Sequence, residues 1–130
     1  MNIRYCSALI FATLVAAGCD VTGPNSSEMA AKRAQNDALW SQRQTVTDSG
    51  KAYAFSADTT REIALIAPAA GGFSYTASDL ERISTAQTGC QALFQGGFLD
   101  LLDGYTPGTN LRGTQEGMEN FRRWQINLDC

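Results

Sequence analysis

The chain has 130 residues, of which 44% are hydrophobic and 18% charged, and its formal net charge is −3. This length and composition fit one small domain with a modest core. The ten basic residues are spread along the chain. Nucleic acid is therefore excluded as the main partner, because binding it requires a concentrated basic patch.

The first eighteen residues have the pattern of an export signal. Arg4 supplies a positive charge, residues 8–17 (ALIFATLVAA) form an uncharged apolar run, and Gly18 and Cys19 follow. The run is shorter than the roughly 20 apolar residues of a transmembrane helix, but it matches the 7–15 or so of a signal peptide. A buried core helix is the alternative interpretation, and it does not account for this order of residue types.

Residues 15–19 (VAAGC) resemble the lipobox of bacterial lipoproteins, with Ala16 standing where Leu is commonest. The resemblance implies that a diacylglyceryl group is transferred to the Cys19 thiol and that the chain is cleaved between Gly18 and Cys19. The new amino group is then often acylated with a fatty acid such as palmitate. Several acyl chains give a durable membrane anchor, with the domain in the periplasm. Asp20 resembles the inner-membrane retention signal of enteric bacteria and favours that membrane over the outer one, although Asp is also a common linker residue.

A short lipidated tether is predicted for residues 19–27, because residues 20–27 (DVTGPNSS) are rich in turn formers. The eight residues after Cys19 reach at most about 27 Å. An N-terminal helix is predicted for residues 28–45, with Glu28 near its positive end. One interpretation places basic side chains and Trp40 of this helix against lipid headgroups: Lys32, Arg33 and Arg43. An ordinary surface helix or a partly disordered segment is the alternative.

Cysteine usage supports export. Cys6 is removed with the signal and Cys19 takes the lipid, which leaves Cys90 and Cys130 as a pair in an oxidising compartment. A disulfide between them is predicted, and it would close a loop of about 40 residues and contribute about 4 kcal/mol. A zinc site is disfavoured because the chain has no histidine, and no C-x-x-C redox pair is present.

The predicted fold of residues 46–130 is a small α+β domain: an antiparallel sheet of three to four strands with one packed helix. Residues 51–57 and 62–67 predict a hairpin around a polar turn. A helix is predicted from the capping-box pattern of Ser78 and Glu81 to Gly89. Its buried face is predicted to include these residues: Leu80, Ile83, Ala86 or Gln87, and Cys90.

The clearest strand pattern is at the carboxyl end, where residues 123–130 (RWQINLDC) alternate between apolar and polar. The alternation predicts that Trp124 and Cys130 both face the core. Residues 91–94 fit a short strand, residues 98–102 a strand or a helical turn, and residues 104–117 a long loop. The helix end at 88–90 followed by the terminal W-x-I-x-L-D-C strand loosely resembles small uncharacterised exported proteins of proteobacteria, a likeness that implies the α+β class but no function.

Few residues in the sequence are suited to catalysis. Without histidine the usual general base is absent, and Lys51 near Ser49 fits a turn better than a dyad. Acidic pairs could serve as catalytic carboxylates or cation ligands, although solvated loop residues are the favoured interpretation: Asp100 with Asp103, and Glu116 with Glu119. Residues 108–114 have phosphate-loop glycine spacing but lack its lysine. We expect no cofactor and no metal.

The sequence therefore predicts a noncatalytic envelope lipoprotein, anchored to the membrane through Cys19, that binds a protein partner or supports an assembly. The loop at residues 104–117 is the expected contact surface. A periplasmic enzyme inhibitor is a specific alternative. A glycan-cleaving enzyme built on carboxylates such as Asp100 and Glu116 is a less favoured one.

Overall fold

The computed structural model describes residues 26–130. The predicted signal peptide, its cleavage point at Gly18 and Cys19, and the tether up to residue 25 lie outside these residues. The chain divides into two compact units, Met1–Gln35 and Asn36–Cys130, and helix α2 (Ser26–Ser41) belongs partly to each. Among residues 26–130, none of the helices is both long enough and apolar enough to cross a bilayer.

Helix α2 differs from its prediction at both ends. It begins at Ser26, inside the predicted tether, and ends at Ser41 rather than at residue 45. Residues 26–35 are exposed on every side, whereas Leu39 and Trp40 pack against the sheet. The helix stops early because the following segment, Gln44–Asp48 (QTVTD), is rich in β-branched residues and pairs with the next strand as β1.

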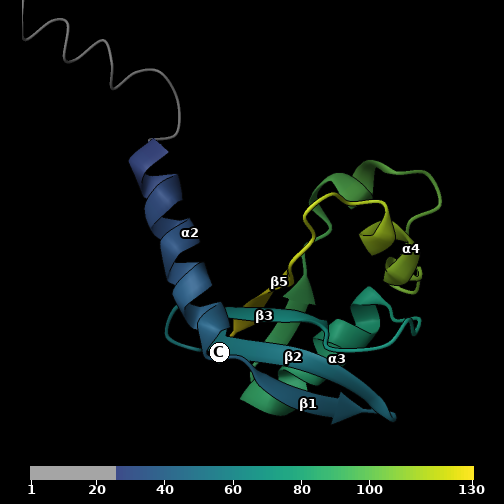
Figure 1. Cartoon of the computed structure of the whole chain (residues 1–130), viewed down its shortest axis with the longest axis horizontal. Coiled ribbons are helices and arrows are strands. Elements are labelled where there is room, and N and C mark those ends of the chain that lie inside the picture. Colours follow the sequence, from purple (N-terminus) through teal and green to yellow (C-terminus); the bar gives the residue numbers. More distant parts are fainter. Residues whose placement is uncertain (1–25) are drawn as a thin grey trace, which may run out of the picture. The chain divides into compact units, whose positions relative to one another are not determined.

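The fold is α+β, as predicted, but the sheet has five strands rather than three or four. All neighbouring strands are antiparallel and lie in the order β1-β2-β3-β5-β4 (Figure 1). The predicted hairpin is confirmed as β2 (Lys51–Asp58) and β3 (Ile63–Pro68). The remaining strands are β4 (Gln91–Phe94) and β5 (Trp124–Asp129). Strand β1 joins β2 through a two-residue turn with positive φ angles at Ser49 (52°) and Gly50 (77°), which matches the right-handed twist of a hairpin.

Strand β3 is the centre of the core. Its residues Ile63–Ala67 are all buried, so both faces of the strand are covered. On one face Ala64 and Ile66 pack with Leu80 and Ile83 of helix α3 in the larger core cluster. On the other face a smaller cluster forms beneath the end of α2, and it consists of Trp40, Ile63, Leu65 and Ala67.

The capping box of helix α3 (Ala77–Thr88) lies two residues earlier in the sequence than predicted. Thr76 and Asp79, rather than Ser78 and Glu81, exchange the reciprocal cap hydrogen bonds. Gly89 ends the helix in the left-handed conformation (φ 76°), as expected. Leu80, Ile83 and Cys90 are buried as predicted, but Ala86 and Gln87 are exposed and Ser84 is buried in their place.

The segment between β4 and β5 contains two short helices. Of the two alternatives predicted for residues 98–102, a strand or a helical turn, the 3₁₀ helix η1 (Gly97–Leu101) agrees with the helical turn. The predicted loop at residues 104–117 contains helix α4 (Leu111–Glu116), so it is only partly a loop. Asn110 caps α4 by accepting a hydrogen bond from the Arg112 N–H, and fully buried Leu111 fixes the helix to the core.

Candidate functional site

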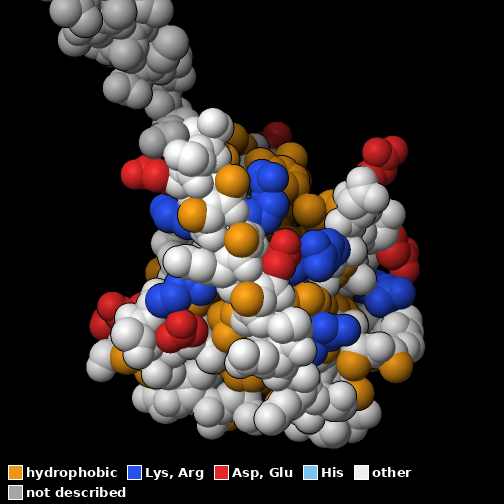
Figure 2. Space-filling view, turned by 60° about the vertical axis from the view of Figure 1, so that its left-hand side comes forward, with side chains coloured by type: hydrophobic (Ala, Val, Ile, Leu, Met, Phe, Trp, Pro, Cys, Tyr) orange, Lys and Arg blue, Asp and Glu red, His pale blue; other side chains and the backbone are white. Residues whose placement is uncertain are grey.

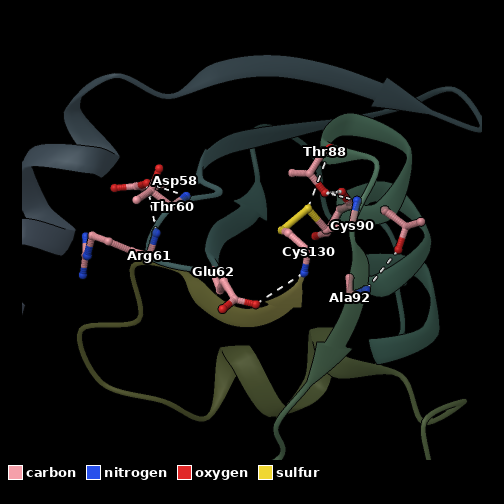
Figure 3. The surroundings of a disulfide bond; sticks show 10 residues. Asp58, Thr60, Arg61, Glu62, Thr88, Cys90, Ala92 and Cys130 are labelled. Atoms are coloured by element: carbon pink, nitrogen blue, oxygen red, sulfur yellow. Dashed lines mark hydrogen bonds between the residues drawn. A yellow bond between two sulfur atoms is a disulfide. The ribbon is translucent and has the colours of Figure 1, made fainter.

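Cys90 and Cys130 form a disulfide in the structure (Figure 3). The bridge joins the end of α3 to the residue that follows β5. The Cys90 N–H donates to Oγ1 of Thr88 (3.2 Å), and the Cys130 N–H donates to Oε2 of Glu62 (3.3 Å). Cys90 is buried, but Cys130 is exposed, contrary to the prediction that it faces the core. The alternation of β5 ends with Leu128, because Cys130 lies past the last strand residue and the core does not extend over it.

Large apolar side chains are exposed on η1 and the residue after it. Leu101 is 85% exposed, Phe98 56% and Leu102 52%; we call these three residues the η1 patch. The segment is held in place by Leu99, whose side chain is only 1% exposed and belongs to the main core cluster. The patch therefore stands on an anchored helical turn.

Two glycines allow β4 to turn into η1. Gly97 has a φ of 57°, in the left-handed region that disfavours residues with a Cβ. At Gly96 a Cβ would meet the Asp100 carboxylate at 2.5 Å, so a side chain there requires that carboxylate to move. The Gly-Gly pair is thus the local sequence feature that sets where the η1 patch begins.

Trp40 packs on the sheet at the end of α2, where its side chain is only 8% exposed. The guanidinium groups of Arg43 and Arg123 lie 5.2 and 5.8 Å from its ring centroid, within cation–π range. Asp37 pairs with Arg123 (2.8 Å) and Arg122 (3.3 Å). The interpretation in which Trp40 faces lipid headgroups is therefore wrong for that residue, since the apolar sheet face offers it more burial.

A surface hollow of about 550 Å³ lies beside Trp40. Arg43 and Arg122 line it together with neutral residues, and no carboxylate is among its lining residues. Arg43 donates to the Trp40 carbonyl (3.0 Å). Figure 2 shows basic side chains spread over the face drawn, with acidic side chains between them, rather than one continuous basic patch.

A buried polar chain links β5 to α4. The Trp124 Nε1–H donates to Oη of Tyr75 (2.7 Å), and the Tyr75 hydroxyl donates to Oε1 of Gln115. Burial raises the pKa of Tyr75 to about 12, so the phenol remains protonated and able to donate at physiological pH. Its ring also meets Tyr53 edge-on. Tyr75 is only 1% exposed, and these contacts assign the chain of hydrogen bonds to the core rather than to a reactive site.

The residues considered for catalysis make surface contacts or lie in exposed turns. Lys51 donates to the Ser74 carbonyl (2.7 Å) and lies over a phenylalanine ring, while Ser49 occupies the β1–β2 turn. Glu116 is 63% exposed and pairs with Arg112 (3.0 Å), and Asp100 is exposed on η1. Within the described part of the chain, no group of three or more His, Cys, Asp or Glu residues could hold a metal ion.

The glycine-spaced segment at 108–114 forms a turn and a helix start. The Thr106 N–H donates to Oγ1 of Thr109 (2.9 Å), and the Gly108 N–H donates to Oγ1 of Thr106 (3.2 Å). These bonds engage local backbone donors within the turn. The segment therefore shapes the approach to α4 and does not form a phosphate-binding loop.

Comparisons with family models, with curated proteins and with solved structures find no match to this chain. The η1 patch is the feature that the sequence did not reveal, because an apolar run such as FLDLL is equally compatible with a buried segment. The following Asp103-Gly104 and the preceding glycine pair were the available signals of a surface turn.

Proposed function

We propose that the chain is a lipid-anchored protein of the bacterial envelope that binds a protein partner through the η1 patch. The observation that carries the proposal is the exposure of Phe98, Leu101 and Leu102 on one anchored turn. Three exposed large apolar side chains within residues 98–102 are a feature of interaction sites, whereas single exposed apolar residues are ordinary. The lipobox resemblance at residues 15–19 supports anchoring through Cys19 with the domain in the periplasm. Asp20 favours the inner membrane.

The chemistry of the patch favours one kind of partner surface. Asp100 lies within the apolar segment at residues 98–102, and Asp103 is the first residue after that segment. An apolar pocket rimmed by lysine or arginine would bury the three large side chains and complement the two carboxylates. The buried Leu99 keeps the turn in place before binding, which reduces the entropy that association must remove.

A photoreactive amino acid in place of Leu101 tests the proposal. In cells that express the full chain, irradiation is expected to give a discrete adduct with one protein. The same amino acid in place of Gln87, an exposed residue of α3, is the matched control and is expected to give none. Phe98→Asp should weaken the adduct at position 101. Equal adduct patterns from positions 101 and 87 would contradict a specific site.

An enzyme inhibitor is the specific form that the geometry favours among binding modules. Among residues 26–130, Leu101 has the most exposed large apolar side chain, and it lies on a short turn between two packed elements, as in a scaffold that presents one residue to a cleft. If the captured partner is a hydrolase, purified protein should reduce its activity and Leu101→Asp should not. The carboxylate-based glycosidase is less well supported, because Glu116 is engaged with Arg112 and Asp100 belongs to the exposed turn.

The anchor is tested by the intact mass of protein extracted from membranes. The expected species contains residues 19–130 plus acyl chains, and Cys19→Ser is expected to leave the membrane fraction or to remain unprocessed. An unmodified wild-type chain in the soluble fraction would contradict the anchor. This result would not bear on partner binding by the η1 patch, which is measured separately.

A further inference from the structure

The two edges of the sheet differ in how their backbone groups are used. At β4 the N–H groups of Ala92 and Phe94 donate to side chains of α3, namely Oγ1 of Thr85 (3.2 Å) and Oε2 of Glu81 (3.0 Å). Both bonds go to α3 rather than to β5, which is the neighbour of β4 in the sheet. The donors that another strand would need at this edge are therefore already engaged.

The opposite edge, β1, is open. The Ala52 carbonyl accepts from the Ala69 N–H (2.9 Å), so Ala52 directs its backbone groups toward β3. Its partner across the ladder is Thr47, which must therefore direct its own N–H and C=O away from β2. By the two-residue alternation of a strand, Thr45 does the same. Within residues 26–130, these four groups have no protein partner.

We propose that β1 pairs antiparallel with β1 of a second copy of this chain, in a register centred on Val46. In this register Thr45 lies opposite the second copy's Thr47, and the reciprocal pair lies two residues further along, on the other side of Val46. Each pair forms two hydrogen bonds, so all four open groups of each strand are used. Val46 meets its own counterpart in the pair that forms no hydrogen bonds.

The strand sequence favours this occupant. The segment T-V-T at 45–47 reads the same in both directions, so antiparallel self-pairing sets threonine against threonine, a favourable cross-strand pair. Gln44 lies opposite Asp48, so no like charges meet. A register centred on Thr45 or on Thr47 instead leaves half of the open backbone groups unused. No other self-register satisfies the edge as fully.

The symmetry of the pair is compatible with anchoring to one membrane. A two-fold axis perpendicular to the sheet relates two antiparallel neighbouring strands and keeps each face of the joined sheet on the same side. Leu39 and Trp40 of α2 pack on one face of the sheet, so these ends of α2 lie on the same side in both copies. Five paired residues give a small interface, weak in dilute solution, and anchoring raises the effective concentration of the copies. The strength of the pairing, but not its geometry, rests on the proposed anchor.

Cysteine at the symmetry axis tests the pairing in the full chain. The Cα atoms of an antiparallel pair without hydrogen bonds lie about 4.5 Å apart, within the range of a disulfide. Val46→Cys is therefore expected to give a covalent dimer on nonreducing gels that reductant removes. Leu93→Cys on β4 is the matched control. Leu93 is 57% exposed, whereas Val46 is half-buried, so random collisions would favour the control.

Thr47→Pro supplies the disrupting variant. The Thr47 N–H points away from β2, so proline there removes no bond of the β1–β2 hairpin. We expect Val46→Cys with Thr47→Pro to fold, by circular dichroism, and to lose at least nine-tenths of the covalent dimer. Thr47→Ala should retain it. Because Val46 contacts the core, the double variant Gln44→Cys, Asp48→Cys gives a second cross-link should Val46→Cys fail to fold.

Membrane fractionation of the same samples separates this proposal from the anchor. Cross-linking by Leu93→Cys equal to that by Val46→Cys, or a Val46→Cys dimer that survives Thr47→Pro, overturns the β1 pairing. So does a membrane-bound, folded Val46→Cys protein that remains monomeric. If the chain proves soluble, the purified protein at about 1 mM replaces the membrane sample, and absence of the dimer there overturns the pairing equally.

Discussion

Opening the Cys90–Cys130 disulfide is expected to destabilise the domain strongly. The bridge joins residues 40 apart in the sequence. In the chain-entropy model a loop of that size restricts the unfolded state by about 4 kcal/mol. For a domain of under 100 residues, each 1 kcal/mol shifts the melting temperature by roughly 4–8 °C. Thermal unfolding followed by circular dichroism should therefore show a fall of roughly 15–30 °C when reductant is added to the wild-type protein.

Serine variants distinguish the contribution of loop closure to stability from the contribution of side-chain packing. Cys130 is exposed, so Cys130→Ser loses little burial and should unfold at the same temperature as reduced wild type. Cys90 is only 7% exposed, so Cys90→Ser should lose about 1 kcal/mol more by burying a hydroxyl. Reductant should have no effect on either variant. A wild-type melting temperature that reductant leaves unchanged would refute the reasoning, as would a reductant effect on Cys130→Ser.

Three further predictions concern the core and the helix cap. Tyr75→Phe leaves the Trp124 Nε1–H without its partner and should cost about 1–3 kcal/mol in urea unfolding, with little change in the native spectrum. Burial raises the pKa values of Tyr53 and Tyr75 to about 12 from 10. As the pH rises, the unfolded chain loses these protons before the folded chain does. The contribution of the two protonated phenols to the free energy of unfolding is therefore fully present below about pH 10 and should be lost between about pH 10 and 12. The expected observation is tyrosinate absorbance that rises together with unfolding. Thr76→Ala removes the α3 cap and should cost about 1 kcal/mol, measured by thermal unfolding against the exposed-site control Gln87→Ala.

The sequence predicted the elements whose patterns are local and strong. The β2–β3 hairpin, the α3 helix with its Gly89 terminus and the alternation of Trp124–Leu128 all depend on contacts that recur every two to four residues. The cysteine pairing followed from counting and compartment, and the structure joins the same two residues. These inferences needed no knowledge of tertiary packing.

The errors came where tertiary contacts override local preference. Residues 42–45 lie next to a good helix, but pairing with β2 draws the chain into β1. Helix α4 is too short for a periodic signal and exists because Leu111 is buried beneath it. In a short apolar run, the pattern alone does not indicate which side chains face solvent, so the η1 patch could not be distinguished from a core segment.

The two proposed binding regions, the η1 patch and strand β1, are associated with opposite edges of the sheet, so both can be used at the same time. The patch follows β4, one edge strand, whereas pairing uses β1, the other. A dimer through β1 therefore leaves both patches free, separated by ten strands whose outermost members lie about 43 Å apart at a strand spacing near 4.8 Å. Two such patches on one membrane would bind a dimeric partner with avidity. Thr47→Pro should then weaken capture of a dimeric partner without changing the affinity of a single site, whereas Leu101→Asp should weaken both.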